Sequence, residues 1–320
     1  MRLFKDFNLG LSWYLANTFN QTFDPQISVS SGYTTIYLQT GYVRNTGLEL
    51  SLVYGHTWNN HFRWESNFAL SLNQNKIKEL VRNSEHPETG ELINKDRLDV
   101  GGLGKARFIL KEGGTLGDLY TQSDLKRDDN GMIDIDPTGA VNIENNLPDI
   151  KLGSVFPKAN LAWNNRFSWK GISLNALFTA RIGGIVYSAT EAAMDQYGVS
   201  ERSALARDNG GVLVNGRTLV DAENYFTKIG SESGLPQYYT YSATNVRLQE
   251  ASIGYTIPRK WLGNVCDIQV SVIGRNLWMI YNKAPFDPES VATTDNYYQG
   301  IDYFMLPSTR NIGFNVKINF

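Results

Sequence analysis

The chain has 320 residues, and its 30 basic and 32 acidic side chains give a formal net charge of −2. This balance gives no sign of binding to nucleic acid or to an anionic membrane surface. No segment reaches the eighteen or so apolar residues of a transmembrane helix, which excludes a helical membrane protein. The single cysteine, Cys266, excludes an internal disulfide. Residues 1–7 hold no signal-peptide core, and because Leu3 already lies in a predicted strand, we expect a segment before it.

The first half of the chain predicts three strands, because apolar and polar residues alternate and successive strand side chains point to opposite faces. Residues 3–15 form the first, and a polar loop follows. Residues 47–57 and 62–73 form a hairpin around the turn Asn59-Asn60. One face of the third strand carries Arg63, Glu65 and Asn67, which is more polarity than the core of a β-sandwich accepts. Residues 74–154 show no sustained period and are expected to be a long loop.

The second half continues the pattern. Residues 159–169 and 172–181 predict a hairpin that turns at Gly171, and a second long loop is expected over residues 183–242. In the strand 246–257 the apolar phase changes between Leu248 and Ala251, which predicts either a β-bulge or a strand that leaves the bilayer near its top. A short connection leads to a strand at residues 267–272. A third long loop over residues 282–307 then leads to the last strand, residues 309–320.

The last strand has one apolar and one polar face. Five apolar residues alternate with Asn311, Gly313, Asn315, Lys317 and Asn319 over about ten residues, the length at which a tilted strand crosses a bilayer. It ends on an aromatic residue, as a strand anchored at the membrane interface does. The apolar residues of this strand are Ile312, Phe314, Val316, Ile318 and Phe320.

Short and long connections alternate along the about eight predicted strands, as the periplasmic turns and extracellular loops of outer-membrane barrels do. Large aromatic residues gather beside the short turns and predict the aromatic girdle of one membrane interface. The predicted fold class is therefore all-β, an antiparallel transmembrane β-barrel segment with short periplasmic turns and long extracellular loops. The girdle residues are Trp58, Phe62, Trp64, Phe167, Trp169, Tyr255 and Trp261.

Several short motifs resemble the SusC/RagA family of TonB-dependent outer-membrane transporters. They are Val-Arg-Asn-Thr-Gly-Leu-Glu-Leu at residues 43–50, Asn-Val-Arg-Leu at 245–248, Gly-Tyr-Thr-Ile-Pro at 254–258, Gly-Arg-Asn-Leu at 274–277, Asp-Pro-Glu at 287–289 and the strand that ends in Phe320. Each motif alone is weak, but the ordered set is quite specific. It covers the chain from about Tyr42 to its end.

The resemblance implies a barrel of roughly 22 strands with a plug in its lumen, of which residues 1–320 supply an open arc near the C-terminus. The plug, the earlier strands and the segment that contacts TonB-ExbB-ExbD would lie elsewhere. Such proteins sit in the outer membrane of Gram-negative, Bacteroidetes-like bacteria. The resemblance also implies the import of glycan oligomers or peptides together with a SusD-like surface lipoprotein. The resemblance implies no cofactor and no chemistry on the substrate.

Three groups of residues are candidates for function. Loop tyrosines offer ring faces to the apolar faces of sugars, although rings of this kind also pack loop against loop. Arginines on polar strand faces can hold the plug by ion pairs or touch an oligosaccharide or peptide substrate, and we favour the plug. The last strand resembles the signal that the barrel-assembly machinery reads. The candidates for sugar contact are Tyr238, Tyr239, Tyr241, Tyr297, Tyr298 and Tyr303. The candidates for plug or substrate contact are Arg63, Arg166, Arg181, Arg247 and Arg275. The candidates for the assembly signal are Phe314, Val316, Ile318 and Phe320.

Enzymatic and metal motifs are weak. The sequence has no His-Glu-x-x-His, Gly-x-Ser-x-Gly or paired Cys-x-x-Cys, and its three histidines lack a ligand-like spacing. The loop from Asp128 to Asp134 has part of a calcium-loop pattern, but Lys126 and Pro137 stand where carboxylates are needed. Two other classes stay open: a soluble all-β carbohydrate-binding or structural module, and a β-sheet glycosidase with two carboxylates in a cleft.

Overall fold

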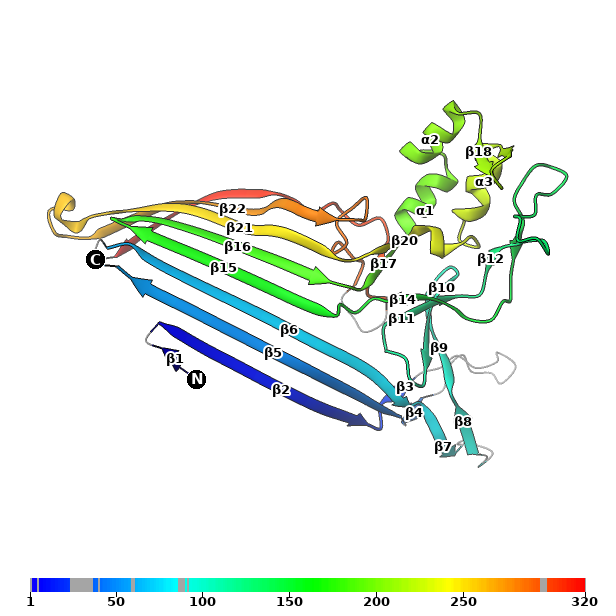
Figure 1. The fold of residues 1–320 in the computed structure, drawn as a ribbon, viewed down its shortest axis with the longest axis horizontal. Helices are drawn as coiled ribbons and strands as arrows, with labels where there is room; N and C mark the ends of the chain where they lie inside the picture. The colour runs from blue at the N-terminus through cyan, green and yellow to red at the C-terminus, as the bar shows by residue number, and fades with distance from the viewer. Residues whose placement is uncertain are drawn as a thin grey trace.

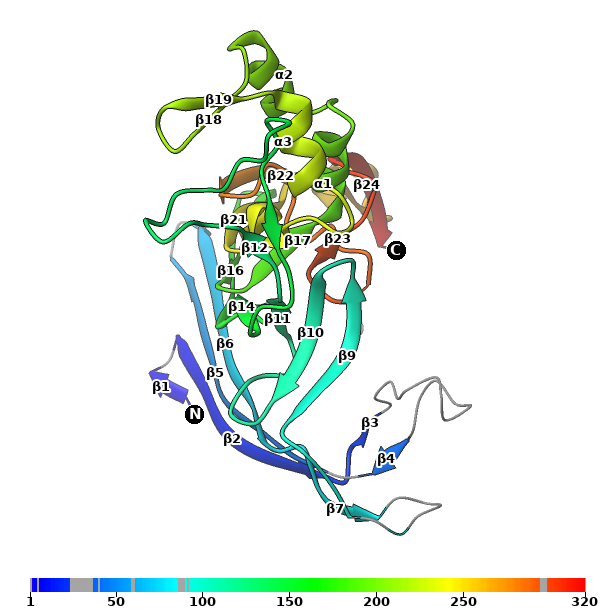
Figure 2. The same cartoon turned by 90° about the vertical axis from the view of Figure 1, so that its right-hand side faces the viewer.

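The computed structural model describes residues 2–4, 6–23, 37–39, 41–58, 61–85, 90, 92–293 and 298–319. Its largest element is an antiparallel sheet of nine strands in the order β1-β2-β5-β6-β15-β16-β21-β22-β24 (Figure 1). A second layer, made of the long connections, stands at one end of this sheet (Figure 2). Among the described residues, no helix has the length and apolar character needed to cross a lipid bilayer.

The strands of the sheet confirm the predicted fold class. Several are longer than predicted, because pairing continues where both faces of a strand are polar and the alternation is lost, as it does at the end of β6. Asn59, Asn60 and Phe320 lie outside the described residues. The strands are β1 (Arg2–Phe4), β2 (Phe7–Phe19), β5 (Tyr42–Thr57), β6 (Arg63–Glu79), β15 (Ala159–Trp169), β16 (Ile172–Ile182), β21 (Asn245–Ile257), β22 (Asp267–Asn282) and β24 (Asn311–Asn319).

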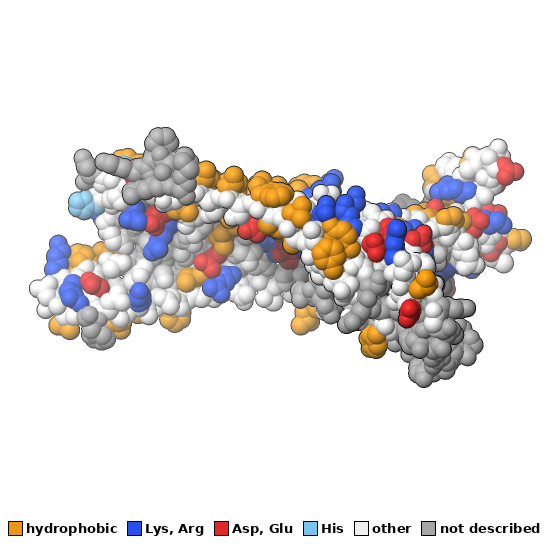
Figure 3. All heavy atoms as spheres, turned by 90° about the horizontal axis from the view of Figure 1, so that it is seen from below, with side chains coloured by type: hydrophobic (Ala, Val, Ile, Leu, Met, Phe, Trp, Pro, Cys, Tyr) orange, Lys and Arg blue, Asp and Glu red, His pale blue; other side chains and the backbone are white. Residues whose placement is uncertain are grey.

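The register gives the sheet one apolar and one polar face. Leu50 pairs with Leu70, Leu70 with Leu161, and Leu161 with Ala180, so apolar side chains form rows across neighbouring strands. Many of these side chains are exposed to the surroundings, among them Phe314 at 82%. A row of hydrophobic side chains follows the upper margin of the sheet in Figure 3. An exposed apolar surface of this extent marks contact with a membrane or a partner.

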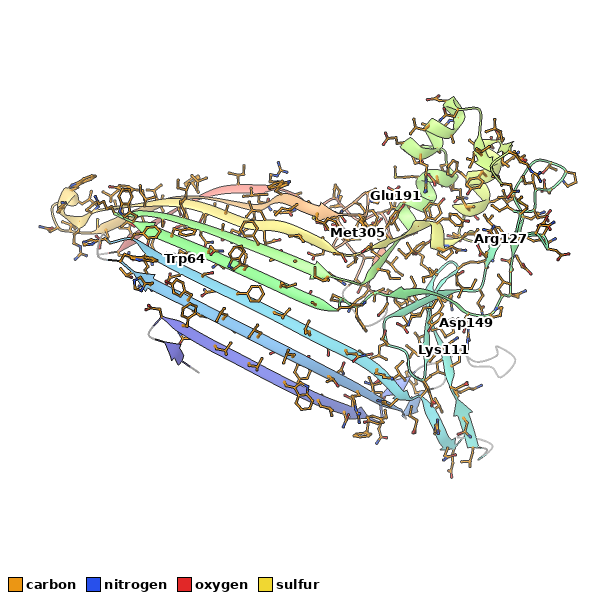
Figure 4. All side chains as sticks on the ribbon, in the orientation of Figure 1. Trp64, Lys111, Arg127, Asp149, Glu191 and Met305 are labelled. Carbon is orange, nitrogen blue, oxygen red and sulfur yellow. The ribbon has the colours of Figure 1, made fainter. Side chains whose placement is uncertain are left out.

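Two polar residues on the apolar face serve two tryptophans. The indole N–H of Trp64 donates to Asn165 Oδ1 at 3.2 Å, and the indole N–H of Trp163 donates to Ser66 Oγ at 3.0 Å. An indole N–H away from water needs an acceptor, so Ser66 and Asn165 remove the cost of placing these rings on an apolar surface. Figure 4 shows Trp64 at the end of the sheet that carries the short turns.

The predicted aromatic cluster lies at that same end. Trp58 and Phe62 have ring centroids 5.4 Å apart, and Trp64 stacks on Phe167 at 6.1 Å. The turn at Gly171 and the 3-10 helix η3 (Arg259–Leu262) provide the other short connections. The predicted bulge is confirmed as well, because the pairing of β21 with β16 and with β22 shifts between Leu248 and Glu250.

The long connections differ from the irregular loops expected for residues 74–154 and 183–242. The first contains a four-stranded sheet in the order β14-β11-β10-β9, and the second contains three helices. Each helix has eight residues, too few to show a clear helical period of apolar residues. The N-cap residues Ser188, Ser200 and Asp221 are the local sequence signals for these helices. The helices are α1 (Ala189–Gln196), α2 (Glu201–Asp208) and α3 (Ala222–Ile229), and η2 (Pro236–Tyr239) follows them.

The long connections together form a loop layer with its own hydrophobic core. Phe108, Leu119, Phe226, Tyr239 and Ile301 all belong to one buried cluster, although they come from three different connections. The strands of this layer are β7 (Val81–Glu85), β8 (Leu92–Lys95), β9 (Arg97–Leu103), β10 (Ala106–Lys111), β11 (Asp118–Thr121), β12 (Asp124–Leu125), β13 (Ile143–Glu144), β14 (Ile150–Ser154), β17 (Ile185–Ser188), β18 (Val212–Val214), β19 (Thr218–Val220), β20 (Thr240–Ser242) and β23 (Ile301–Asp302), with the short pair β3 (Thr22–Phe23) and β4 (Leu38–Gln39) beside it.

Candidate functional site

The polar face of the sheet carries a shallow hollow of about 420 Å³. Its floor is formed by small residues that lie side by side on adjacent strands: Gly10 pairs with Ser51, Ser51 with Ala69, and Ala69 with Ala162. Its rim includes Glu49, Ser71 and Asn160. Small and polar side chains leave room here for another polypeptide segment or a hydrophilic ligand to approach the backbone closely.

Of the five predicted arginines, Arg63, Arg181, Arg247 and Arg275 have side-chain contacts within the described chain, and Arg166 is placed by its strand register. Arg63 pairs with Glu65 on the same strand, and Arg275 on β22 binds Glu250 on β21 at 2.9 Å. Arg181 donates to the backbone carbonyl of Val155 at 2.8 Å. Arg166 pairs in register with Glu65 and Asn175 on the neighbouring strands. The five residues thus come from the polar side of the sheet, and their contact with a plug stays a prediction.

Arg247 differs from the others because it is buried and joins three sequence motifs. It is 4% exposed, and its guanidinium holds Asp287 through two hydrogen bonds, Nη2 to Oδ1 at 2.8 Å and Nη1 to Oδ2 at 3.0 Å. Glu289 is a second carboxylate partner at 3.2 Å, and Asn245 donates to it at 3.2 Å. Asn276 lies 3.5 Å from Nη1. The motifs at residues 245–248, 274–277 and 287–289 therefore meet in one network.

This network ties a loop to the sheet. Burial alone raises the pKa of the Asp287 carboxyl, but the hydrogen bonds and charge of Arg247 outweigh it and bring that pKa below its ordinary value. Asn276 also donates to the carbonyl of Thr309, directly before β24, at 3.3 Å. No local sequence pattern predicts this contact, since Asp287 lies far along the chain from Arg247. The network fixes the third long connection against β21 and β22.

The predicted tyrosines occupy different environments in the loop layer. Tyr239 is completely buried, so it offers no ring face to a sugar in this structure. Tyr238 is partly buried, and this burial raises its pKa to about 12. Tyr241 packs edge-on against Phe286, whereas Tyr298 and Tyr303 are 43% and 52% exposed. Tyr297 lies outside the described residues.

Tyr239 supports the helices through Asp195. Its hydroxyl donates to Asp195 Oδ2 at 2.9 Å, and the same carboxylate binds Arg202 and Ser200. Arg202 lies over the ring of Tyr239 at 5.1 Å from the centroid. Burial, and then the charge of Asp195, raise the pKa of Tyr239 strongly, so the phenol stays a hydrogen-bond donor. The exposed rings Tyr298 and Tyr303 remain the ones that a ligand can reach.

Asp149 is another buried carboxylate, at the base of the loop layer (Figure 4). Its side chain is 5% exposed and pairs with Arg97 at 2.7 Å and Lys111 at 2.9 Å. The hydrogen bond from Arg97 is the main reason that the pKa of Asp149 lies far below its ordinary value. Gln122 donates to it as well, at 2.9 Å. The carboxylate thereby joins β9 and β10 to the segment before β14.

The calcium-like loop uses its carboxylate internally. Asp128 Oδ1 accepts the backbone N–H groups of Asn130 and Met132, each at 2.9 Å. Asp136 closes a second turn in the same way through Thr138 and Ala140. Within the described residues no group of three His, Cys, Asp or Glu side chains is arranged to hold a metal ion. These turns shape a hairpin loop of the second layer.

The predicted assembly strand lies at the edge of the sheet. Phe314, Val316 and Ile318 pair in register with Val272, Val270 and Ile268 on β22, and the other edge of β24 has no partner in the described chain. All three apolar side chains are exposed. Recognition of this strand by the barrel-assembly machinery stays a prediction.

Comparison with known proteins gives relatives over nearly the whole chain. No protein-family profile matches it. TonB-dependent receptor P3 of Formosa agariphila is 25% identical over 97% of this chain and 32% of the receptor. TonB-dependent receptors P39 and P26 of the same bacterium are 20% and 23% identical, over 98% and 97% of this chain. The chain thus spans about a third of the length of these curated relatives.

Solved structures show the same fold. A chain of the RagAB peptide transporter superposes with a TM-score of 0.70 at 18% identity, over 98% of this chain and 33% of that one. The RagAB peptide importer in its "closed-closed" state also gives 0.70, over 34% of its chain. These likenesses confirm the resemblance to TonB-dependent receptors of the SusC/RagA kind and the fold class of a transmembrane barrel segment.

Proposed function

We propose that this chain is part of the barrel wall of an outer-membrane TonB-dependent importer, and that residues 1–320 form an arc of a wider barrel near its C-terminal end. One observation carries the proposal: a sheet with one exposed apolar face has its short turns at one end and a folded loop layer at the other. The two ends of an outer-membrane barrel differ in this way. The TonB-dependent receptors that resemble the chain support the same assignment.

The cargo that we propose is an oligomeric nutrient, either a glycan or a peptide, received together with a SusD-like surface lipoprotein. The folded loop layer supports this, because it provides a structured surface rather than flexible tips. The similar RagAB protein is named as a peptide importer, which favours a peptide over a glycan. Energy would come from TonB-ExbB-ExbD through a segment outside this chain. The exposed rings Tyr298 and Tyr303 are the proposed contacts with cargo.

The polar face is the proposed lumen wall. Its hollow over Ser51, Ala69 and Ala162 would face the plug, and Arg63, Arg166 and Arg275 would be ion-pair donors elsewhere on the same face. Because Arg63 and Arg275 already have carboxylate partners in this chain, a plug would contact mixed charges and not free cations. Arg247 instead serves the loop layer, since it is buried there with Asp287.

Uptake by the full-length protein tests this function. In cells that carry it, labelled oligopeptides and oligosaccharides of several sizes should be taken up only when TonB is present. Tyr303→Ala should lower uptake, whereas Leu213→Ala, a change at another exposed loop residue, serves as the matched control. The purified protein should require detergent. A detergent-free soluble monomer, or uptake unchanged without TonB, would rule the proposal out and favour the soluble binding module.

The last strand gives a separate prediction about assembly. In the full-length protein, Phe320→Ala should lower the amount of folded barrel in the outer membrane, because the terminal aromatic would no longer be available to the assembly machinery. Heat-modifiable migration on gels measures folded barrel directly. The control is Asn319→Ala, on the polar face of the same strand. Equal amounts of folded barrel in both variants and the parent would contradict the assembly role.

A further inference from the structure

Two connected hollows on the apolar face form a groove near the short turns, which we call the apolar groove. The first has a volume of about 290 Å³ and lies over Phe167, Trp169, Ile172 and Leu174. The second has a volume of about 520 Å³, shares Phe167 and Leu174 with the first, and continues over Ala176 and Ala251. The walls are almost entirely carbon, so the groove suits a hydrocarbon ligand.

The shape of the groove follows from side-chain size and register. Ala176 pairs with Ala251, while Leu174 pairs with Ile253 on one side and Phe178 pairs with Leu248 on the other. The two methyl groups therefore lie lower than the bulky side chains around them. Ile172 and Ala176 are about 13 Å apart along the strand at about 3.3 Å per residue. With the strand tilt of about 40° in outer-membrane barrels this is about 10 Å of depth, which lies within the about 15 Å of one leaflet.

Two cationic side chains stand at the turn end of the groove. Lys170 directly follows Trp169 and places its Nζ 5.0 Å from the centroid of that ring. Lys260 belongs to η3, and the backbone N–H of Thr256 donates to the carbonyl of Gly171 at 2.8 Å, which joins the two turns. In the described part of the chain, the neighbouring Arg259 has an acidic partner, Asp267, but no ion pair involves Lys170 or Lys260.

We propose that the apolar groove binds one phospholipid of the membrane, with an acyl chain in the groove and the phosphate between Lys170 and Lys260. The charge fits, because a phosphate is the anion that a membrane presents at the depth of an aromatic girdle. An acyl chain gains little free energy when it exchanges other acyl chains for an apolar protein surface. A specifically bound lipid therefore differs from the surrounding lipids in its fit to the groove and in its headgroup contacts. The site rests on the proposed function in one respect, that the apolar face contacts lipid.

Native mass spectrometry of the full-length protein in detergent tests the site, with phosphatidylglycerol as the added lipid. Ala251→Phe fills the groove from a position that faces lipid, and it should weaken the first lipid adduct about tenfold, because the ring takes the place of the acyl chain and removes its packing contacts. Lys170→Gln and Lys260→Gln should each weaken it about fivefold. Ala180→Phe makes the same change on the apolar face of β16 but outside the groove, and it should leave the adduct unchanged.

The outcomes separate the site from the proposed function. Full lipid binding by Ala251→Phe, or an equal loss in Ala180→Phe, would overturn the site while leaving the importer in place. A protein that needs no detergent would remove the importer and the site together. A lysine effect that is the same for phosphatidylglycerol and for an uncharged diacylglycerol would overturn the phosphate contact, because only the former carries the anion.

Discussion

Leu70→Arg in the full-length protein should strongly reduce the amount of folded barrel. Leu70 lies on the apolar face between Leu50 and Leu161, near the middle of the apolar band. An arginine that faces lipid near the midplane of the bilayer costs about 2 to 4 kcal/mol. Urea titration of the purified protein in lipid measures the loss of stability, and heat-modifiable migration measures the amount that folds in cells.

The matched control is Asn67→Arg on the same strand. Asn67 is exposed on the polar face and pairs with Val53 and Asn164, so its variant keeps a polar side chain in a polar environment. Folding should be preserved, and any effect should be on uptake. The two outcomes would exchange if the register were displaced by one residue. Equal tolerance of both changes would argue for a sheet that faces water on both sides.

Arg247→Met should destabilise the attachment of the loop layer by about 3 to 5 kcal/mol. The variant keeps much of the volume of the side chain but leaves the buried carboxylate of Asp287 without its cation, and it also removes the partner of the more exposed Glu289. Limited proteolysis of the connection between β22 and β24 should become much faster, while the barrel itself stays folded. Arg247→Lys should be intermediate, because an ammonium keeps the charge but not the paired hydrogen bonds.

Arg275→Met is the control for that result. Arg275 also binds a carboxylate, Glu250 at 2.9 Å, but its side chain is 66% exposed. Exposed ion pairs contribute about 1 kcal/mol or less, so this variant should resist proteolysis as the parent does. If both variants behave alike, burial does not decide the strength of these pairs, and Arg247 has no special part in holding the loop.

The sheet could be predicted from the sequence because its pattern is local. Each strand shows its faces in the alternation of its own residues, and the hairpin at Gly171 follows from two alternating runs on either side. The bulge after Leu248 was visible for the same reason. The ends of β6 and β22 were not, because the alternation stops while the backbone pairing continues. The end of β6 is mostly polar on both faces, whereas residues 277–281 of β22 are apolar on both faces.

The loop layer could not be predicted in the same way. Composition placed Tyr238 and Tyr239 on a surface, but burial depends on helices that pack over them from elsewhere in the chain. The partners of Arg247 and Asp149 are likewise set by tertiary contacts, which no period in the sequence reports. Capping residues such as Ser188, followed by Glu191, were the local signal that helices were present.

The shared core of the loop layer has a consequence for the order of folding. Phe108 and Ile301 lie in one buried cluster, and β17 forms a parallel pair with β23, so this core needs residues that lie far apart in the chain. Contacts between such distant residues close large loops and form slowly. The hairpins of the sheet, whose contacts are local, should therefore assemble first. The loop layer would then fold in a single late step, so a folded loop layer would indicate that the sheet is already complete.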